Sequence, residues 1–149
     1  MRSRSAALLF LFAVLATPAA AQTSSYSYGF RAGASVDPDQ FYFGGQIETK
    51  PLVENVHFRP NVEIGVGNDV TLVGINFELA YKFPTKQPWR PYVAGGPALN
   101  IFRANGESEA QGGFNIALGV EHRGGLFGEV KIGALDSPDF KFGIGFRFR

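Results

Sequence analysis

The most regular feature of the sequence is an alternation of bulky apolar residues with small or polar ones. From Val73 to Phe83 the odd positions are apolar, and the even positions from Gly74 to Lys82 are small or polar. From Phe140 to Phe148 the even positions are apolar, and the odd positions carry Lys, Gly or Arg. A period of two is typical of a β-strand with one apolar and one polar face. Both segments are therefore predicted to be strands.

Other parts of the chain follow the same rhythm. Val56 to Val66 and Phe114 to Val120 alternate clearly, and Tyr26 to Arg31 alternate more weakly because small residues occupy both faces. Turn-forming sequences separate the segments: Asp37-Pro38-Asp39, Lys50-Pro51, Gly67-Asn68-Asp69, Pro84 to Pro88, Asn105-Gly106, Arg123-Gly124-Gly125 and Asp136 to Asp139. The seven turns predict eight antiparallel strands of about 9 to 14 residues, longer than the roughly 5 to 6 usual in globular proteins and long enough to cross a bilayer.

The first residues have the form of a secretory signal peptide. Arg2 and Arg4 precede an apolar run from Ala6 to Ala16, which is too short for a membrane helix of about 20 residues. Small residues then favour cleavage after Ala21, which gives a signal peptide at 1–21 and a mature domain at 22–149. The chain has no cysteine, which excludes disulfides and a lipid-anchored cysteine. Its near-neutral charge excludes a basic surface for nucleic acid.

The face that points inward separates a membrane barrel from a soluble one. A soluble barrel that binds an apolar ligand would turn its Phe and Ile residues inward. The polar face, however, is rich in residues small enough for the crowded interior of eight strands: Gly74, Ala80, Ala94, Gly96, Ala98, Ala117, Gly119, Gly143 and Gly145. We therefore predict that the polar face is internal and that the apolar face contacts lipid.

This orientation predicts an ion network inside the barrel, because buried charges must be paired. The predicted members are Arg31, Glu48, Arg59, Glu63, Glu78, Lys82, Arg90, Glu121, Glu129, Lys131, Lys141 and Arg147. We expect Arg59 to lie near Glu78, and Arg147 near Glu129. Aromatic residues at the strand ends predict two membrane-interface girdles: Tyr26, Phe58, Tyr81, Phe83, Trp89 and Phe148 on the periplasmic side, and Phe41, Phe43, Phe114, Phe140 and Phe142 on the other.

Together these features resemble the small outer-membrane barrel families that include the OmpA transmembrane domain and OmpX. The resemblance covers residues 25 to 149 and rests on the signal sequence, the eight alternating segments and the aromatic last strand, which ends Phe148-Arg149. It implies recognition by the barrel-assembly machinery during insertion, outer-membrane lipid as the surroundings, and a Gram-negative outer-membrane location. The outward connections, including Ala104 to Gln111 with Glu107 and Glu109, are short.

The resemblance also raises the possibility of a lipid-modifying enzyme, because some barrels of this kind have that activity. A hydrolase needs a nucleophile beside a base, but neither His57 nor His122 has a serine two residues away. Asp37, Asp39, Asp136 and Asp139 are ordinary turn residues, and no glycine pair opens a helix as a phosphate-binding loop does. We therefore expect no catalytic, cofactor or metal residues.

The sequence thus predicts an all-β protein, an eight-stranded up-and-down transmembrane barrel with short turns. It is expected to be a monomeric, porin-like membrane protein without a wide pore, with a structural or interaction role. The alternatives left open are a soluble secreted or periplasmic barrel that binds an apolar ligand and a lipid-active enzyme.

Overall fold

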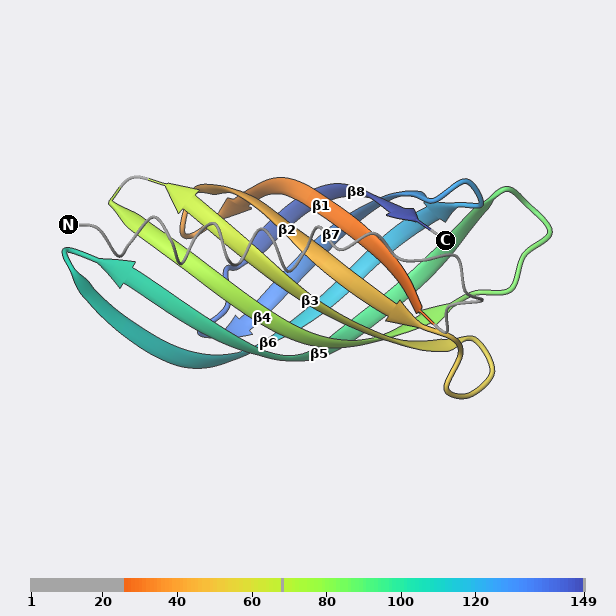
Figure 1. Ribbon diagram of the computed structural model, residues 1–149, viewed down its shortest axis with the longest axis horizontal. Coiled ribbons are helices and arrows are strands. Elements are labelled where there is room, and N and C mark those ends of the chain that lie inside the picture. Colours follow the sequence, from red (N-terminus) through yellow and green to blue (C-terminus); the bar gives the residue numbers. More distant parts are fainter. Residues whose placement is uncertain (1–25, 68, 149) are drawn as a thin grey trace.

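The computed structural model describes residues 26–67 and 69–148 and contains one closed antiparallel β-barrel. Its strands are β1 (Tyr26–Val36), β2 (Gln40–Thr49), β3 (Val56–Gly67), β4 (Val70–Lys82), β5 (Trp89–Ala104), β6 (Glu107–His122), β7 (Leu126–Leu135) and β8 (Phe140–Phe148). Each strand pairs with its neighbour in the chain, and β8 closes the barrel on β1 (Figure 1). The described residues contain no helix of the length and apolarity needed to cross a membrane.

The predicted eight-stranded barrel is confirmed, and each predicted turn falls at a connection between consecutive strands, although Gly67 still belongs to β3 and Asn68 lies outside the described residues. One connection differs from expectation. Residues 104–111 were predicted as a loop, whereas β5 and β6 each run for 16 residues and are joined only by Asn105 and Gly106. Both turn residues have positive φ, 51° and 80°. An Asn-Gly pair favours this two-residue hairpin turn, whose twist matches that of the flanking strands. The hairpin therefore continues as sheet to its tip.

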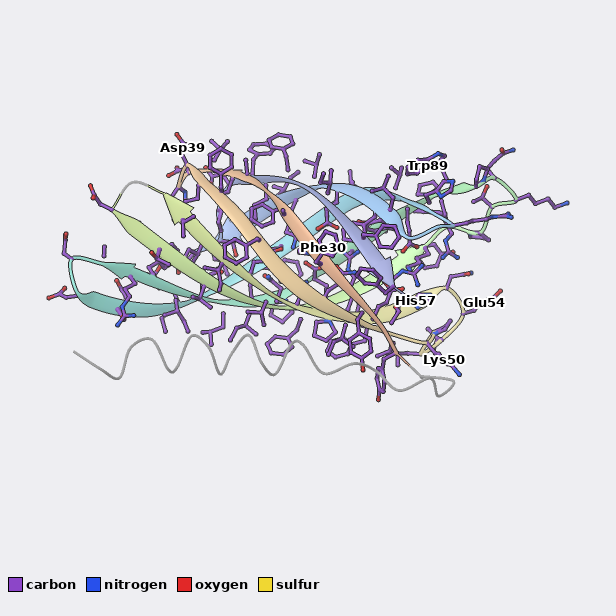
Figure 2. All side chains as sticks on the ribbon, turned by 45° about the horizontal axis from the view of Figure 1, so that its top comes forward. Phe30, Asp39, Lys50, Glu54, His57 and Trp89 are labelled. Atoms are coloured by element: carbon purple, nitrogen blue, oxygen red, sulfur yellow. The ribbon has the colours of Figure 1, made fainter. Side chains whose placement is uncertain are left out.

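The barrel has its polar face inside and its apolar face outside. On β4 the side chains of Asn76, Glu78 and Lys82 are buried, while the alternate residues Phe77 and Leu79 are about half exposed. Side chains cover the outer wall, and Asp39 lies at one end while Lys50, Glu54 and Trp89 lie toward the other (Figure 2). The hypothesis of a soluble barrel with an internal apolar ligand is therefore wrong, because it needed the Phe and Ile face inside.

Aromatic side chains lie on the outer wall near both ends. All predicted girdle residues are exposed except Phe58, which is partly buried. Tyr81 and Phe83 make an edge-to-face contact at one end, with ring centroids 5.0 Å apart, and Phe140 and Phe142 stack at 6.4 Å at the other. The predicted signal peptide and its cleavage after Ala21 lie outside the described residues.

Glycine allows the wall to close tightly at some inward positions. A Cβ on Gly96 would lie 1.8 Å from the backbone oxygen of Phe77 on the neighbouring strand. On the outer wall the situation differs, because the nearest atom to a Cβ on Gly128 would be the oxygen of Gly143 at 3.8 Å, an ordinary contact.

The first prediction follows from this contrast. Gly96→Ala should lower the free energy of unfolding by about 1–3 kcal/mol, because the added methyl group must displace backbone. Gly128→Ala is the matched control and should change it by less than about 0.5 kcal/mol. Urea titration in detergent, followed by tryptophan fluorescence, measures both. Equal stability of the two variants would contradict the packing described here.

Candidate functional site

The charged interior is the most distinctive feature of the molecule. All residues of the predicted network are buried in the barrel except Arg90, whose side chain is 34% exposed at the rim. Among the described residues, the ion pairs made by Arg and Lys form two separate clusters. The central cluster contains Arg31, Arg59, Glu63, Glu78, Glu129, Lys131 and Lys141, and the end cluster contains Glu48, Lys82, Arg90, Glu121 and Arg147.

Each carboxylate of the central cluster is shared by several basic groups. Glu129 forms an ion pair with Arg31 at 2.9 Å and accepts a hydrogen bond from Arg59 at 3.1 Å. Glu63 contacts Arg31 at 2.9 Å and also pairs with Lys141. Because these groups are removed from water, only such multiple pairing can offset the cost of burying them. The cluster therefore acts as one cross-braced unit.

Glu78 and Lys131 complete this unit. Glu78 accepts from Arg59 at 2.9 Å, as expected from the sequence, and from Lys131 at 2.6 Å. Arg59 and Glu78 are direct partners in the β3–β4 register, which explains why the strand pattern alone could place them together.

The end cluster surrounds Glu121. Arg147 Nε lies 2.6 Å and Lys82 Nζ 3.0 Å from its carboxylate, and Arg90 approaches it at 3.4 Å. Lys82 also pairs with Glu48. This end of the interior therefore has its own set of ion pairs. On β4 it is separated from the central cluster by Ala80, which packs with Tyr92, Ala94 and Ala117.

The expected pairing of Arg147 with Glu129 is wrong. In the β7–β8 register Glu129 lies opposite Gly143, and Arg147 lies four residues further along β8, where its backbone N–H bonds to Gly125. The offset brings the Arg147 side chain to Glu121 on β6 instead. The sequence pattern predicted that both side chains point into the barrel, but it did not predict the stagger between their strands.

The network is supported by residues that the sequence reasoning missed. They are the aromatic residues Phe127, Tyr92 and Tyr42, and Gln46. Arg31 lies over the Phe127 ring at 5.6 Å, Arg59 over Tyr92 at 4.8 Å, and Lys141 over Tyr42 at 4.6 Å. Such contacts stabilise cations in excess of the available carboxylates.

Tyr92 and Gln46 also form hydrogen bonds with members of the central cluster. The Tyr92 hydroxyl donates to Glu129 at 2.6 Å, and Arg31 donates to Gln46 at 2.7 Å. The alternation of faces along each strand could have predicted these residues. Gln46 and Tyr42 lie on the same face of β2 as Glu48, and Phe127 lies on the same face of β7 as Glu129.

An asparagine chain crosses the interior beside the central cluster. Asn115 donates to Asn76, and Asn76 donates to Asn61, each at 2.8 Å. All three side chains are buried. Because the Asn76 amide accepts from Asn115 and donates to Asn61, the chain links β6, β4 and β3 without charge.

The two histidines have structural partners. His57 donates from Nδ1 to the Thr49 carbonyl at 2.8 Å, and His122 accepts at Nδ1 from the Gly124 N–H at 3.0 Å and packs edge-on against Trp89. In the described residues neither ring is hydrogen-bonded to a hydroxyl side chain, and no group of three or more His, Asp or Glu residues could hold a metal ion.

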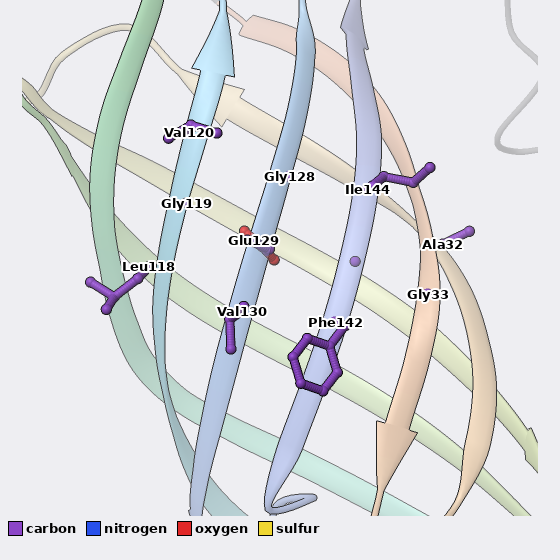
Figure 3. Close-up of a pocket in the computed structure, with 11 residues that line it drawn as sticks. Ala32, Gly33, Leu118, Gly119, Val120, Gly128, Glu129, Val130, Phe142 and Ile144 are labelled. Carbon is purple, nitrogen blue, oxygen red and sulfur yellow. The ribbon is translucent and has the colours of Figure 1, made fainter.

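A shallow apolar groove of about 600 Å³ lies on the outer wall over β6, β7, β8 and β1. Gly128 forms its floor, while Val120, Val130, Phe142 and Ile144 form its sides (Figure 3). Glu129 lies behind the wall and points inward, so its carboxylate belongs to the interior network. The groove presents hydrocarbon and backbone to the surroundings.

The second prediction concerns the shared carboxylate. Glu129→Gln leaves Arg31, Arg59 and Lys131 with one partner fewer and should cost about 3–5 kcal/mol of stability, as expected when one member of a buried ion network is removed. Glu107→Gln, at an exposed position, is the control and should cost less than about 0.5 kcal/mol. Urea unfolding in detergent measures both, and a mild effect at position 129 would show that the cluster is not cross-braced.

The third prediction tests the corrected pairing. A double-mutant cycle on Arg147 and Glu121 should give a coupling energy of about 0.5–3 kcal/mol, whereas a cycle on Arg147 and Glu129 should be additive within about 0.5 kcal/mol. The conservative changes Arg147→Met and Glu→Gln keep side-chain volume. A larger coupling to Glu129 than to Glu121 would contradict the observed stagger.

Comparison with known proteins places the fold. No family model and no curated protein matches the chain. Among solved structures, it is similar to the N-terminal β-barrel domain of Pseudomonas aeruginosa OprF, with a TM-score of 0.60 and 18% identity over 85% of this chain and 100% of that one. It is also similar to Neisserial surface protein A, with a TM-score of 0.68 and 16% identity over 82% of this chain and 94% of that one.

A structure from the de novo design of transmembrane β-barrels gives a TM-score of 0.51 at 14% identity, over 85% of this chain and 98% of that one. At such low identity these similarities establish the fold alone. They agree with the resemblance to small outer-membrane barrels seen in the sequence. The chain therefore has the fold of an eight-stranded transmembrane β-barrel.

Proposed function

We propose that this protein is a closed, monomeric barrel of a Gram-negative outer membrane that acts through its surface, without catalysis. The observation that carries the proposal is the inverted distribution of side chains. Charged groups fill the inside in paired clusters, while the outer wall is apolar. In water this arrangement would be unfavourable, but in lipid it satisfies both faces.

The packed interior argues against a wide channel. Arg31, Arg59, Lys131 and Glu63 are among the largest fully buried side chains. Arg31 and Lys131 meet at Glu63, and Arg59 reaches across the barrel to Glu129. An eight-stranded barrel is only wide enough to be filled by its own side chains. We therefore assign the barrel the role of an anchor that holds its loops at the membrane surface.

The proposed orientation places both chain ends in the periplasm and the β1–β2, β3–β4, β5–β6 and β7–β8 turns outside the cell. Export would use the predicted signal peptide, and insertion would use the barrel-assembly machinery, for which the aromatic β8 is the expected recognition strand. The similarity to a protein known as a Neisserial surface protein supports a location at the cell surface.

The fourth prediction tests location and closure together. The mature protein should occur in the outer-membrane fraction, and unboiled protein should migrate faster in a detergent gel than boiled protein, because the barrel stays folded. In planar bilayers it should give no steady porin-sized conductance. Soluble protein without a mobility shift would contradict the membrane barrel, and a large steady conductance would contradict the closed interior.

A further inference from the structure

The edge of β6 is open near the tip of the β5–β6 hairpin. Glu107 to Gly112 pair with β5 only, because the pairing of β6 with β7 begins at Gly113 opposite Leu135. No other described strand pairs with this part of β6. Figure 1 shows the hairpin extending well beyond the turn between β7 and β8. A six-residue strand edge is therefore left without a neighbour at the proposed outer end.

The neighbouring connection explains why this edge stays open. Leu135 has a positive φ of 60° and ends β7, and Ser137 then folds back into the barrel mouth. Asn100 holds it there by donating to the Ser137 hydroxyl at 3.1 Å and to the Asp136 carbonyl at 2.9 Å. The β7–β8 connection is therefore held against Asn100 on β5 and does not pair with residues 107–112 of β6.

The turn geometry indicates which backbone groups are unpaired. In a two-residue hairpin the flanking residues, here Ala104 and Glu107, bond to each other. Backbone groups then alternate between the two edges along β6. Ser108, Ala110 and Gly112 therefore direct their N–H and C=O groups to the open side. Residues 107–112 contain no proline, so every edge N–H is present, and the charges that discourage pairing with a like strand are the carboxylates of Glu107 and Glu109.

The acidic residues at the proposed outer end of the barrel favour a basic partner. The outer turns and the hairpin tip carry Asp37, Asp39, Asp69, Glu107, Glu109, Asp136 and Asp139, and Arg103 is the one basic residue among the described residues of these segments. Glu107 and Glu109 lie on the open strand itself and are exposed. A strand added at this edge would place its alternate side chains next to these two carboxylates.

The opposite face of the same strand favours bulky apolar side chains in the partner. Ser108, Ala110 and Gly112 are small and exposed, and a Cβ on Gly112 would meet nothing within 4 Å. Large residues of an added strand could extend over them without a clash. The edge therefore fits a strand in which basic and bulky apolar residues alternate.

We infer that an extended, basic segment of another protein binds here by adding as a strand to the open edge of β6. The main-chain groups of Ser108, Ala110 and Gly112 would supply the hydrogen bonds, and Glu107 and Glu109 would select Lys or Arg, which is the general mode of β-strand addition. This inference rests on the proposed function, because it names the partner of the surface that the barrel displays.

The fifth prediction uses the full mature chain, folded in detergent, and a fluorescent peptide, acetyl-Lys-Val-Lys-Val-Lys-Val-amide. Fluorescence anisotropy should show saturable binding that weakens as salt increases. The matching peptide with Glu in place of Lys should bind at least about tenfold more weakly, because like charges would face each other. Equal binding of the two peptides would overturn the charge selection.

Substitution at Ala110 separates strand addition from simple charge attraction. Ala110→Pro removes an edge N–H and should weaken binding at least about tenfold, while Ala110→Val keeps the N–H and should retain it. The gel mobility shift of each variant, measured before binding, reports whether the barrel is intact. An intact Ala110→Pro barrel that binds normally would overturn strand addition. Loss of the shift in the unaltered protein would instead count against the proposed function.

Discussion

The sharing of buried carboxylates among several basic side chains is the interaction on which this structure depends. Glu129 and Glu63 each hold basic groups from strands on different sides of the barrel. Without that sharing, charges on the inner face would be too costly to bury. With it, the same charges cross-brace the strands and fill the interior, while the bulky apolar residues lie on the outer wall. The inverted polarity of the barrel thus depends on this sharing, while its closure comes from the pairing of β8 with β1.

The alternation in the sequence was sufficient to predict the fold because it is a local property. The period of two predicted which residues of β4 and β8 point inward, and turn-forming residues marked each connection. The hairpin tip was predicted less well, since Glu107 and Glu109 looked like loop residues. The conformation of Asn105-Gly106 decides the matter, because it lets β5 and β6 continue to the turn.

The interior contacts were only partly predictable. Arg59 and Glu78 lie opposite each other on adjacent strands, so register and facing together suffice. Arg147 and Glu121 lie on strands that are not neighbours, and their approach depends on the stagger that accumulates around the closed barrel. Single-sequence patterns do not fix this stagger. The aromatic partners Tyr92 and Phe127 were missed for a different reason, because small residues occupy both faces of β5 and β7 and weaken the alternation there.

The long chain separation within the central cluster has a consequence for assembly. Arg59 reaches Glu129, 70 residues away, and Lys141 reaches Glu63, 78 residues away. While β7 and β8 are still absent, the inner face of a growing sheet carries charges whose final partners have not arrived, and hydrocarbon would not tolerate them. The strands must therefore enter the lipid together or be sheltered until the last one is in place. The network that stabilises the finished barrel makes its insertion an all-or-none event.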